Sequence, residues 1–489
     1  MPTSPSLLSA LLFPALAGGL AWGIRGQYGH ESGAMLAGLL VSLVLTLLYC
    51  PAAPSLFAFR AVAWCTIAMG IGGSETYGQT IGLTQDAPLI GHWDALAWGM
   101  LGLAIKGGLW IGFAGTLLGM GLGGKRYHHG ELPLVLLAMI GLSLVGIWLF
   151  NQPFEPSQKV LPWLYFSDDW YWEPDTVLKP RREAWGGMAL ALGGLLSYVT
   201  CVRRDGLAWR MGLWGLLGGA LGFPGGQCIQ AFHAWNPSLF QGGVWTWLAP
   251  LMNWWNCMET AFGLILGGTL GLGLWLHQRR IKPPEASPPV TLHVAVEWLL
   301  VVVHVFLLTC SEFNVSEYVG RGWGRLYASG LAMAIIPLAG VAGGRWWPYL
   351  LTLPITALPI AGKTLRKLAY ESGDIALVPG WLCYLILPLT LTLAVAVWLA
   401  LRSRRDVLAR TELRLALLLT TWLYLSLNFG FFQFPWPWQP WTSRTPNALI
   451  FALCALGLTV CALWYGRSRR GAGVDRNPEV TGETQDHAH

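Results

Sequence analysis

Charged residues are scarce in this sequence of 489 residues. Asp, Glu, Lys and Arg make up only 11% of it, hydrophobic residues make up 54%, and the mean hydropathy is +0.49. Soluble globular domains carry about a quarter charged residues, so this composition excludes a soluble domain and predicts a polytopic membrane protein. The net charge of +6 is small, and the basic residues form short clusters between apolar runs. That distribution is typical of membrane topology signals and excludes a nucleic-acid-binding face.

Motifs for metals and nucleotides are also missing. The nine cysteines show no C-x-x-C spacing and no two histidines stand four residues apart, so a metal site would have to be assembled from separate helices. Gly119–Gly124 matches G-x-G-x-x-G, but no strand precedes it in a βαβ unit. The segments 124–126 and 357–364 resemble phosphate-binding loops, but no strand of a βαβ unit precedes them either, so they are not predicted to bind a nucleotide. We therefore predict neither a metal nor a cofactor.

Apolar windows of about 20 residues predict about fourteen membrane-spanning helices, and the fold class is an all-α polytopic bundle. The proline-rich segment 283–290 separates a Gly-rich repeat module, residues 1–282, from an accessory module, residues 291–466. Residues 471–489 are polar and aperiodic, which predicts a disordered cytoplasmic tail. The spans are expected near 7–24, 33–50, 59–77, 95–121, 131–150, 184–202, 206–228, 247–276, 291–310, 325–342, 346–362, 380–401, 412–432 and 447–466.

Lys and Arg clusters in short loops predict the orientation. The long loop 151–183 and the Trp/Pro-rich loop 433–446 fall on the outer side. Lys363, Arg366 and Lys367 also fall there, against the rule, and the preceding span 346–362 is either a crossing or a re-entrant segment. We predict a multi-pass protein of the cell (inner/cytoplasmic) membrane. Its cytoplasmic side carries both termini and the basic clusters 125–126, 203–204, 279–282, 402–405 and 467–470.

A glycine-glutamine pattern recurs three times. Gly18, Gly70 and Gly218 each stand eight residues before a Gly-Gln pair, and each pair falls at the outer end of a predicted helix. Aligning 115–116 with 268–269 extends the match, so the hairpin 59–121 echoes 206–276. We predict an internal parallel repeat of Gly-rich helix hairpins, which is one way in which transporter folds are built. Packing alone is the alternative explanation of such a repeat.

Polar and ionisable residues gather near these helix ends and at two mid-span positions. Lys106 and Glu259 fall at equivalent positions of the repeat, and a charge at that depth is costly unless it is paired or lines a cavity. Asn256 shares the helix face of Glu259. Helix ends broken by glycine would together form a polar cavity open to the outer side. The alternative is that these helix ends only fray at the membrane interface. The candidate substrate-binding residues are Arg25, Gln27, His30, Glu31, Glu75, Gln79, Lys106, Gln227, His233, Asn256 and Glu259.

Tryptophan is abundant, with 29 residues. Most of them stand near span ends, where they would form interfacial belts. In the outer loop, Trp170 and Trp172 follow Asp168 and Asp169. Aromatic faces beside carboxylates suit sugars or quaternary amines, and an aromatic lid packed on the bundle is the alternative.

We expect a carrier for a small polar solute of an anionic or sugar-like kind, with Lys106 and Glu259 as a deeper gate or coupling pair. One alternative is a membrane-embedded transferase or hydrolase acting on a glycan or lipid-linked substrate at the outer leaflet, with His30, Glu31, His233 or Asp94 as acid/base groups. A non-catalytic subunit of a membrane complex is the other. The expected partners are the lipid bilayer and a small-molecule solute, without nucleic acid, and homo-oligomerisation stays open.

Overall fold

The structure, a computed structural model, describes residues 5–28, 31–72, 77–312, 338, 340–344, 356–403, 409–431 and 441–466. Within them all regular structure is helical, apart from one isolated bridge between Glu155 and Val160. The predicted all-α class is confirmed for this part of the chain. The tail 471–489 lies outside the described residues, as do most of the expected spans 325–342 and 346–362 and most of the loop 433–446.

Nine helices of the described chain are long and apolar enough to cross a membrane. The prediction of about fourteen spans is not confirmed by these nine; α2 (Glu31–Tyr49) and α11 (Val294–Glu312) contain shorter apolar stretches. The long helix α8 (Ala208–Trp235) falls outside the nine but packs inside the bundle. The nine are α1 (Leu7–Arg25), α3 (Ser55–Gly72), α5 (Trp93–Leu122), α6 (Glu131–Phe150), α7 with its π-turn (Trp185–Val202), α10 (Trp254–Leu276), α17 to α18 (Leu377–Trp398), α19 (Ala409–Phe431) and α20 (Thr445–Tyr465).

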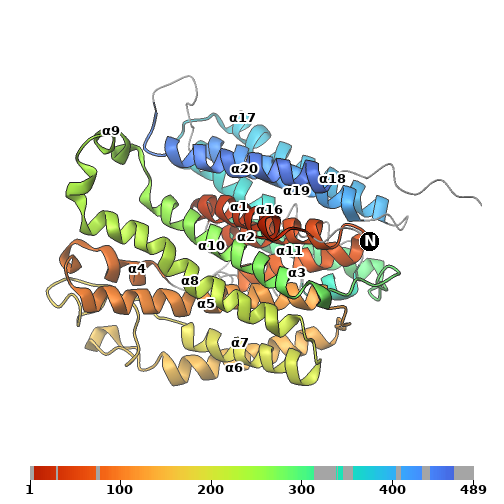
Figure 1. Ribbon diagram of the computed structural model, residues 1–489, viewed down its shortest axis with the longest axis horizontal. Coiled ribbons are helices and arrows are strands. Elements are labelled where there is room, and N and C mark those ends of the chain that lie inside the picture. The colour runs from red at the N-terminus through yellow and green to blue at the C-terminus, as the bar shows by residue number, and fades with distance from the viewer. Residues whose placement is uncertain are drawn as a thin grey trace, which may run out of the picture.

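The helices lie side by side in a bundle (Figure 1). The pair α6 and α7 flanks α5, which packs along α8; α8 packs along α10, and α10 along α1. Helices α19 and α20 cover the opposite flank beside α1 and α2. The α1–α10–α8–α5 row therefore forms the middle of the described structure.

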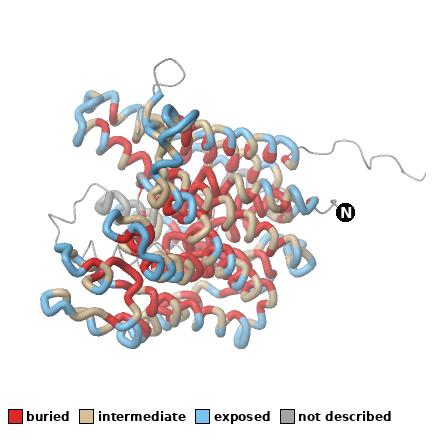
Figure 2. Tube along the Cα trace, turned by 60° about the vertical axis from the view of Figure 1, so that its left-hand side comes forward, coloured by how far each residue is buried: buried red, intermediate tan, exposed pale blue. Residues whose placement is uncertain are grey.

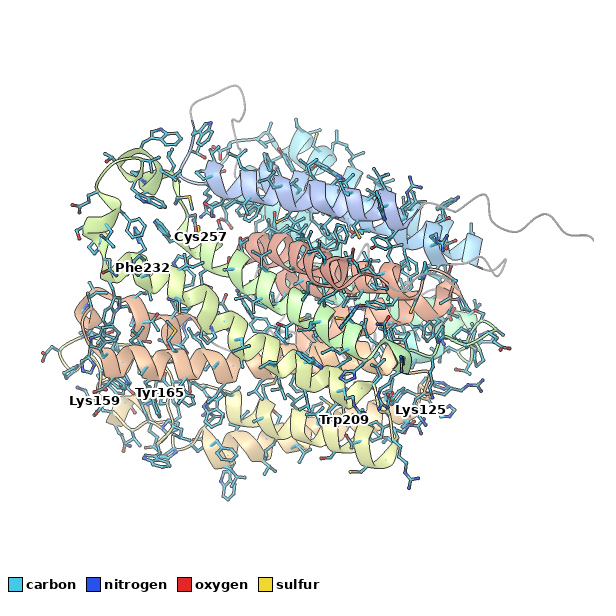
Figure 3. The ribbon with its side chains drawn as sticks, in the orientation of Figure 1. Lys125, Lys159, Tyr165, Trp209, Phe232 and Cys257 are labelled. Atoms are coloured by element: carbon cyan, nitrogen blue, oxygen red, sulfur yellow. The ribbon has the colours of Figure 1, made fainter. Side chains whose placement is uncertain are left out.

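The two ends of the bundle carry different loops. Lys125 and Trp209 lie at one end, near the N-terminus, whereas Lys159, Tyr165 and Cys257 lie toward the other (Figure 3). We call these the Lys125 end and the Lys159 end. The loop 151–184, which joins α6 to α7, thus lies at the end opposite the Lys125 cluster, as the sequence predicts.

Glycines bring the central helices into backbone contact. A Cβ built on Gly219 of α8 would lie 1.9 Å from the carbonyl oxygen of Gly107 in α5. One built on Gly18 of α1 would lie 2.1 Å from the carbonyl oxygen of Gly263 in α10. Small residues at such crossings allow close packing where lipid supplies no hydrophobic drive between helices. These glycines are therefore packing surfaces between the central helices.

The outer faces of the bundle are apolar. Helix α6 has the highest mean hydropathy of the nine helices, yet only 22% of its 18-residue apolar stretch is buried. Leu134, Leu144 and Trp148 of α6 are exposed, and α8 turns its glycines inward while Leu213 and Leu221 face outward. Figure 2 shows the buried core surrounded by this exposed rim. An apolar surface of this extent on a soluble protein would cause aggregation, and it fits contact with lipid.

Candidate functional site

An enclosed ion pair joins α1 to α10. Arg25 ends α1 and is 1% exposed, and Glu259 lies in the second turn of α10 and is 4% exposed. The Arg25 Nη2 donates to Glu259 Oε1 over 3.1 Å. The amide of Asn256 donates to Glu259 Oε2 over 3.4 Å and to the carbonyl oxygen of Gly23 over 3.0 Å. Asn256 and Glu259 thus act from one face of α10, as their spacing predicts.

Aromatic rings surround the guanidinium group of Arg25. Its Cζ lies 4.7 Å from the ring centre of Trp22, 5.1 Å from that of Tyr77 and 5.6 Å from that of Trp110. Cation–π attraction strengthens when the cation is removed from water, as it is here. The buried indole N–H of Trp22 has no hydrogen-bond partner. We call these four residues with Asn256 and Glu259 the Arg25 centre.

The regions of the three Gly-Gln pairs meet at this centre. A Cβ on Gly26 would lie 2.8 Å from Glu259 Oε2, so this position leaves room for the carboxylate only as glycine. Tyr77, which precedes Gly78, packs against Phe223 of α8 with ring centres 4.9 Å apart. A Cβ on Gly226 would lie 2.4 Å from the carbonyl oxygen of Met258 in α10. Segments distant in the sequence therefore converge on the second turn of α10.

Lys106 belongs to a second buried ion pair. Its Nζ lies 2.5 Å from Glu183 Oε1 and 2.7 Å from Thr80 Oγ1, and both charged side chains are fully buried. Glu183 also accepts hydrogen bonds from the Ser167 hydroxyl over 2.8 Å and from the backbone N–H of Phe166 over 3.2 Å. Nearly every polar atom of this ion pair therefore has a hydrogen-bond partner inside the protein. We call this set the Lys106 cluster.

This arrangement corrects the hypothesis that Lys106 and Glu259 form one gate or coupling pair. Each is neutralised by a different residue, Lys106 by Glu183 and Glu259 by Arg25. The physical reason is that the loop 151–184 folds against the bundle and brings a carboxylate to Lys106. The sequence predicts the side of the membrane on which this loop lies, but not that it folds back onto α5.

The other predicted site residues have different surroundings. The amide of Gln79 donates to the carbonyl of Lys179 and accepts from the N–H of Arg181, so it fastens the loop 151–184. Gln227 donates to Thr84 Oγ1 over 2.8 Å, and His233 stacks on Trp254 with ring centres 4.0 Å apart. The side chains of Gln27, His30, Glu31 and Glu75 lie outside the described part of the chain.

Sequence reasoning did not single out several residues at these sites. Tyr77, Trp110 and Glu183 are not among the candidate residues that the sequence predicts. Arg444, just before α20, donates to Asn256 Oδ1 over 3.3 Å. The one available signal was the run Arg181–Glu183 directly before a predicted span, since charges at such a boundary need solvent or partners. Trp110 stands in an apolar run and gave no signal.

Acidic residues crowd the loop 151–184 at the Lys159 end. Asp168, Asp169 and Glu173 are each less than 10% exposed, and one oxygen of Asp168 and one of Glu173 have no hydrogen-bond partner. Burial and the nearby Glu173 carboxylate raise the pKa of Asp168 to about 6. Burial also raises the pKa of Asp86, Asp169 and Glu173. In the described part of the chain, no group of three or more His, Cys, Asp or Glu side chains is placed to hold a metal ion.

The acidic loop should be less stable at neutral pH than in mild acid. Because the folded-state pKa of Asp168, about 6, lies above the ordinary value of about 3.9, folding favours its protonated form. This stabilisation is complete below about pH 4 and is lost as the pH rises through about 6. We expect Asp168→Asn to raise stability at pH 7.5 by about 1 kcal/mol. Thermal unfolding in detergent at pH 5 and pH 7.5 measures the change.

The matched control is Asp175→Asn, which changes an exposed carboxylate of the same loop. It should leave the difference between the two melting temperatures as in the unmodified protein. The reasoning would be wrong if Asp168→Asn melted at the temperature of the unmodified protein at both pH values.

No family model matches this sequence, and a search of curated proteins finds no match. The class of protein must therefore be defined by the fold and the two buried ion pairs. The apolar helices and their exposed apolar faces fit a helical membrane protein. Its central helices enclose one ion pair among aromatic rings and a second beneath a loop.

Proposed function

We propose that this protein is an integral membrane carrier for a small polar solute and that the Arg25 centre is its binding site. The observation that supports the proposal is the Arg25–Glu259 pair, enclosed between α1 and α10 and faced by three aromatic rings. Removing two charges from water is costly, and apolar residues of similar volume often give equal or greater stability. An ion pair retained among membrane helices is therefore a functional-site hypothesis by default.

The two buried pairs differ in their surroundings. The Lys106 cluster ties a loop to the bundle, and its carboxylate is saturated with hydrogen bonds. The Arg25 centre instead joins several transmembrane helices and contains the unpartnered N–H of Trp22. The Lys106 cluster therefore suits a structural role. The Arg25 centre offers a ligand a hydrogen-bond donor and apolar ring faces. This contrast favours the Arg25 centre as the site.

The glycine contacts are consistent with a repeated unit. Helices α5 and α8 cross through Gly107 and Gly219, and α1 and α10 cross through Gly18 and Gly263. We propose that the repeated hairpins 59–121 and 206–276 meet where α5 crosses α8, and that they rock about the Arg25 centre during transport. By the bias of Lys and Arg in short loops, the Lys125 end would face the cytoplasm.

Transport by reconstituted protein tests the proposal. Proteoliposomes are screened with small organic anions and sugars, and at least one solute should move faster than in empty vesicles. Arg25→Gln should lower the uptake rate by about 30-fold or more, since losing one partner of a desolvated charge pair costs about 2–5 kcal/mol. Arg25→Lys keeps the charge but loses the planar fork, so it should fold and transport weakly.

The matched control is Arg279→Gln, which changes an exposed arginine just after α10. It should transport at the rate of the unmodified protein. The proposal would fail if folded Arg25→Gln and Arg25→Lys both transported at that rate, or if no solute moved.

A further inference from the structure

We infer that the solute is a small monocarboxylate that displaces Glu259 from Arg25, and that Glu259 takes up a proton as it leaves. The inference rests on the proposed carrier function and names its substrate class and its coupling ion. It is drawn from the groups that surround Glu259, which already occupies the position that such a solute would take.

The donors of the Arg25 centre match a carboxylate. A guanidinium group presents a planar fork that pairs with two carboxylate oxygens, and Arg25 Nη2 is bonded to one oxygen of Glu259. Asn256 Nδ2 lies near the other oxygen. The indole N–H of Trp22, on a ring centred 4.7 Å from the guanidinium carbon, is fully buried and lacks an acceptor. A second carboxylate entering here would meet donors already oriented for its own chemistry.

The walls of the centre favour an organic anion over a strongly hydrated inorganic one. Trp22, Tyr77 and Trp110 each turn a ring toward Arg25. Aromatic faces bury apolar groups and offer an inorganic phosphate little to replace its water. The guanidinium group lies within 5.6 Å of all three ring centres, so a ligand bound beside it would have to be small. A carboxylate on a small apolar body fits these walls.

Displacement of Glu259 requires a proton. Glu259 is 4% exposed, so a bare carboxylate separated from Arg25 would be a buried, unpaired charge. The charged groups that face it in the described structure are Arg25 from α1 and Arg444 from the start of α20. Protonation converts the carboxylate to a neutral acid that can keep its hydrogen bond to Asn256. One anion and one proton enter together, so the net charge of the centre is unchanged.

Ligand binding to the purified full chain in detergent tests the inference without requiring transport. The probes are acetate, lactate and benzoate, with inorganic phosphate and glucose for contrast, followed by calorimetry between pH 5.5 and 7.5. The carboxylates should bind more tightly than phosphate or glucose. Because one proton is taken up, affinity should rise about tenfold for each unit by which the pH falls. Buffers of different ionisation enthalpy should report the uptake of one proton.

Glu259→Gln imitates the protonated state and provides the decisive variant. It should bind the carboxylates with no dependence on pH and no proton uptake. The control Glu155→Gln, at an exposed position of the loop 151–184, should keep the tenfold slope. The inference is overturned if none of the three carboxylates binds, if binding to the unmodified protein takes up no proton, or if Glu259→Gln keeps the slope.

These outcomes separate the inference from the carrier function. Carboxylate binding with proton uptake, but no flux into proteoliposomes, would refute the carrier and leave a proton-linked carboxylate site. Flux of a sugar without carboxylate binding would support the carrier and refute the substrate class.

Discussion

Replacing Lys106 by methionine is expected to destabilise the protein by about 3–5 kcal/mol, because it leaves the carboxylate of Glu183 buried without its cation. Both side chains of the pair are 0% exposed, so water cannot take the place of the ammonium group. The loop 151–184 should detach first, since Glu183 connects Phe166 and Ser167 to α5. Thermal unfolding in detergent and limited proteolysis within this loop measure the two effects.

A second substitution distinguishes this mechanism from a simple loss of packing. Adding Glu183→Gln to Lys106→Met removes the unpaired buried charge and keeps one side-chain oxygen as an acceptor. The remaining amide oxygen can accept from the N–H of Phe166, while the amide NH2 can donate to the Ser167 hydroxyl, which accepts as well as donates. The double variant should therefore be more stable than Lys106→Met alone, as paired replacement of buried ions often is. Lys179→Met, at an exposed lysine of the same loop, should have no measurable effect. If the double variant were no more stable than Lys106→Met, the buried charge would not be the cause.

The sequence predicted the helical class and most helix positions because apolar length and glycine spacing are local properties. The span predicted at 95–121 agrees with α5 (Trp93–Leu122), and the one predicted at 247–276 ends with α10 (Trp254–Leu276) but begins in the segment before it. Hydropathy delimits such helices because it depends only on the local sequence. Gly263, Gly267 and Gly271 recur every four residues, a spacing that predicts close helix packing in lipid, and each of them meets the backbone of α1. These features follow from short-range sequence alone.

The partners of the buried charges could not be predicted in the same way. Glu183 reaches Lys106 across 77 residues, and Glu259 reaches Arg25 across 234. Such pairings depend on how a loop folds back and on which helices become neighbours, and neither is encoded in periodicity. Repeat equivalence placed Lys106 and Glu259 at matching positions, but equivalence in a repeat does not imply contact. Asn256 and Glu259 were correctly grouped because three residues along one helix fix their common face.

Replacing Gly219 by leucine is expected to abolish folding of the bundle. Its Cβ alone would lie 1.9 Å from the carbonyl oxygen and 2.4 Å from the carbonyl carbon of Gly107. Both are backbone atoms of α5, so no side-chain rotation can relieve the overlap, and the helices would have to separate along their whole contact. Even alanine should cost about 1–3 kcal/mol, the usual penalty of overpacking. Fluorescence-detected size-exclusion chromatography and thermal unfolding measure the yield and stability of folded protein.

Gly141 of α6 supplies the matched control, because a Cβ built there meets nothing within 4 Å and the position is exposed. Gly141→Leu should fold normally, and Gly141→Ala should gain about 0.5–1 kcal/mol of helix stability. The difference between the two sites isolates steric contact from helix propensity, since both glycines lie inside long apolar helices. Equal stability of Gly219→Leu and Gly141→Leu would mean that α5 and α8 do not cross at backbone contact. The α1–α10–α8–α5 row would then be too loosely packed to hold Arg25 and Glu259 in register.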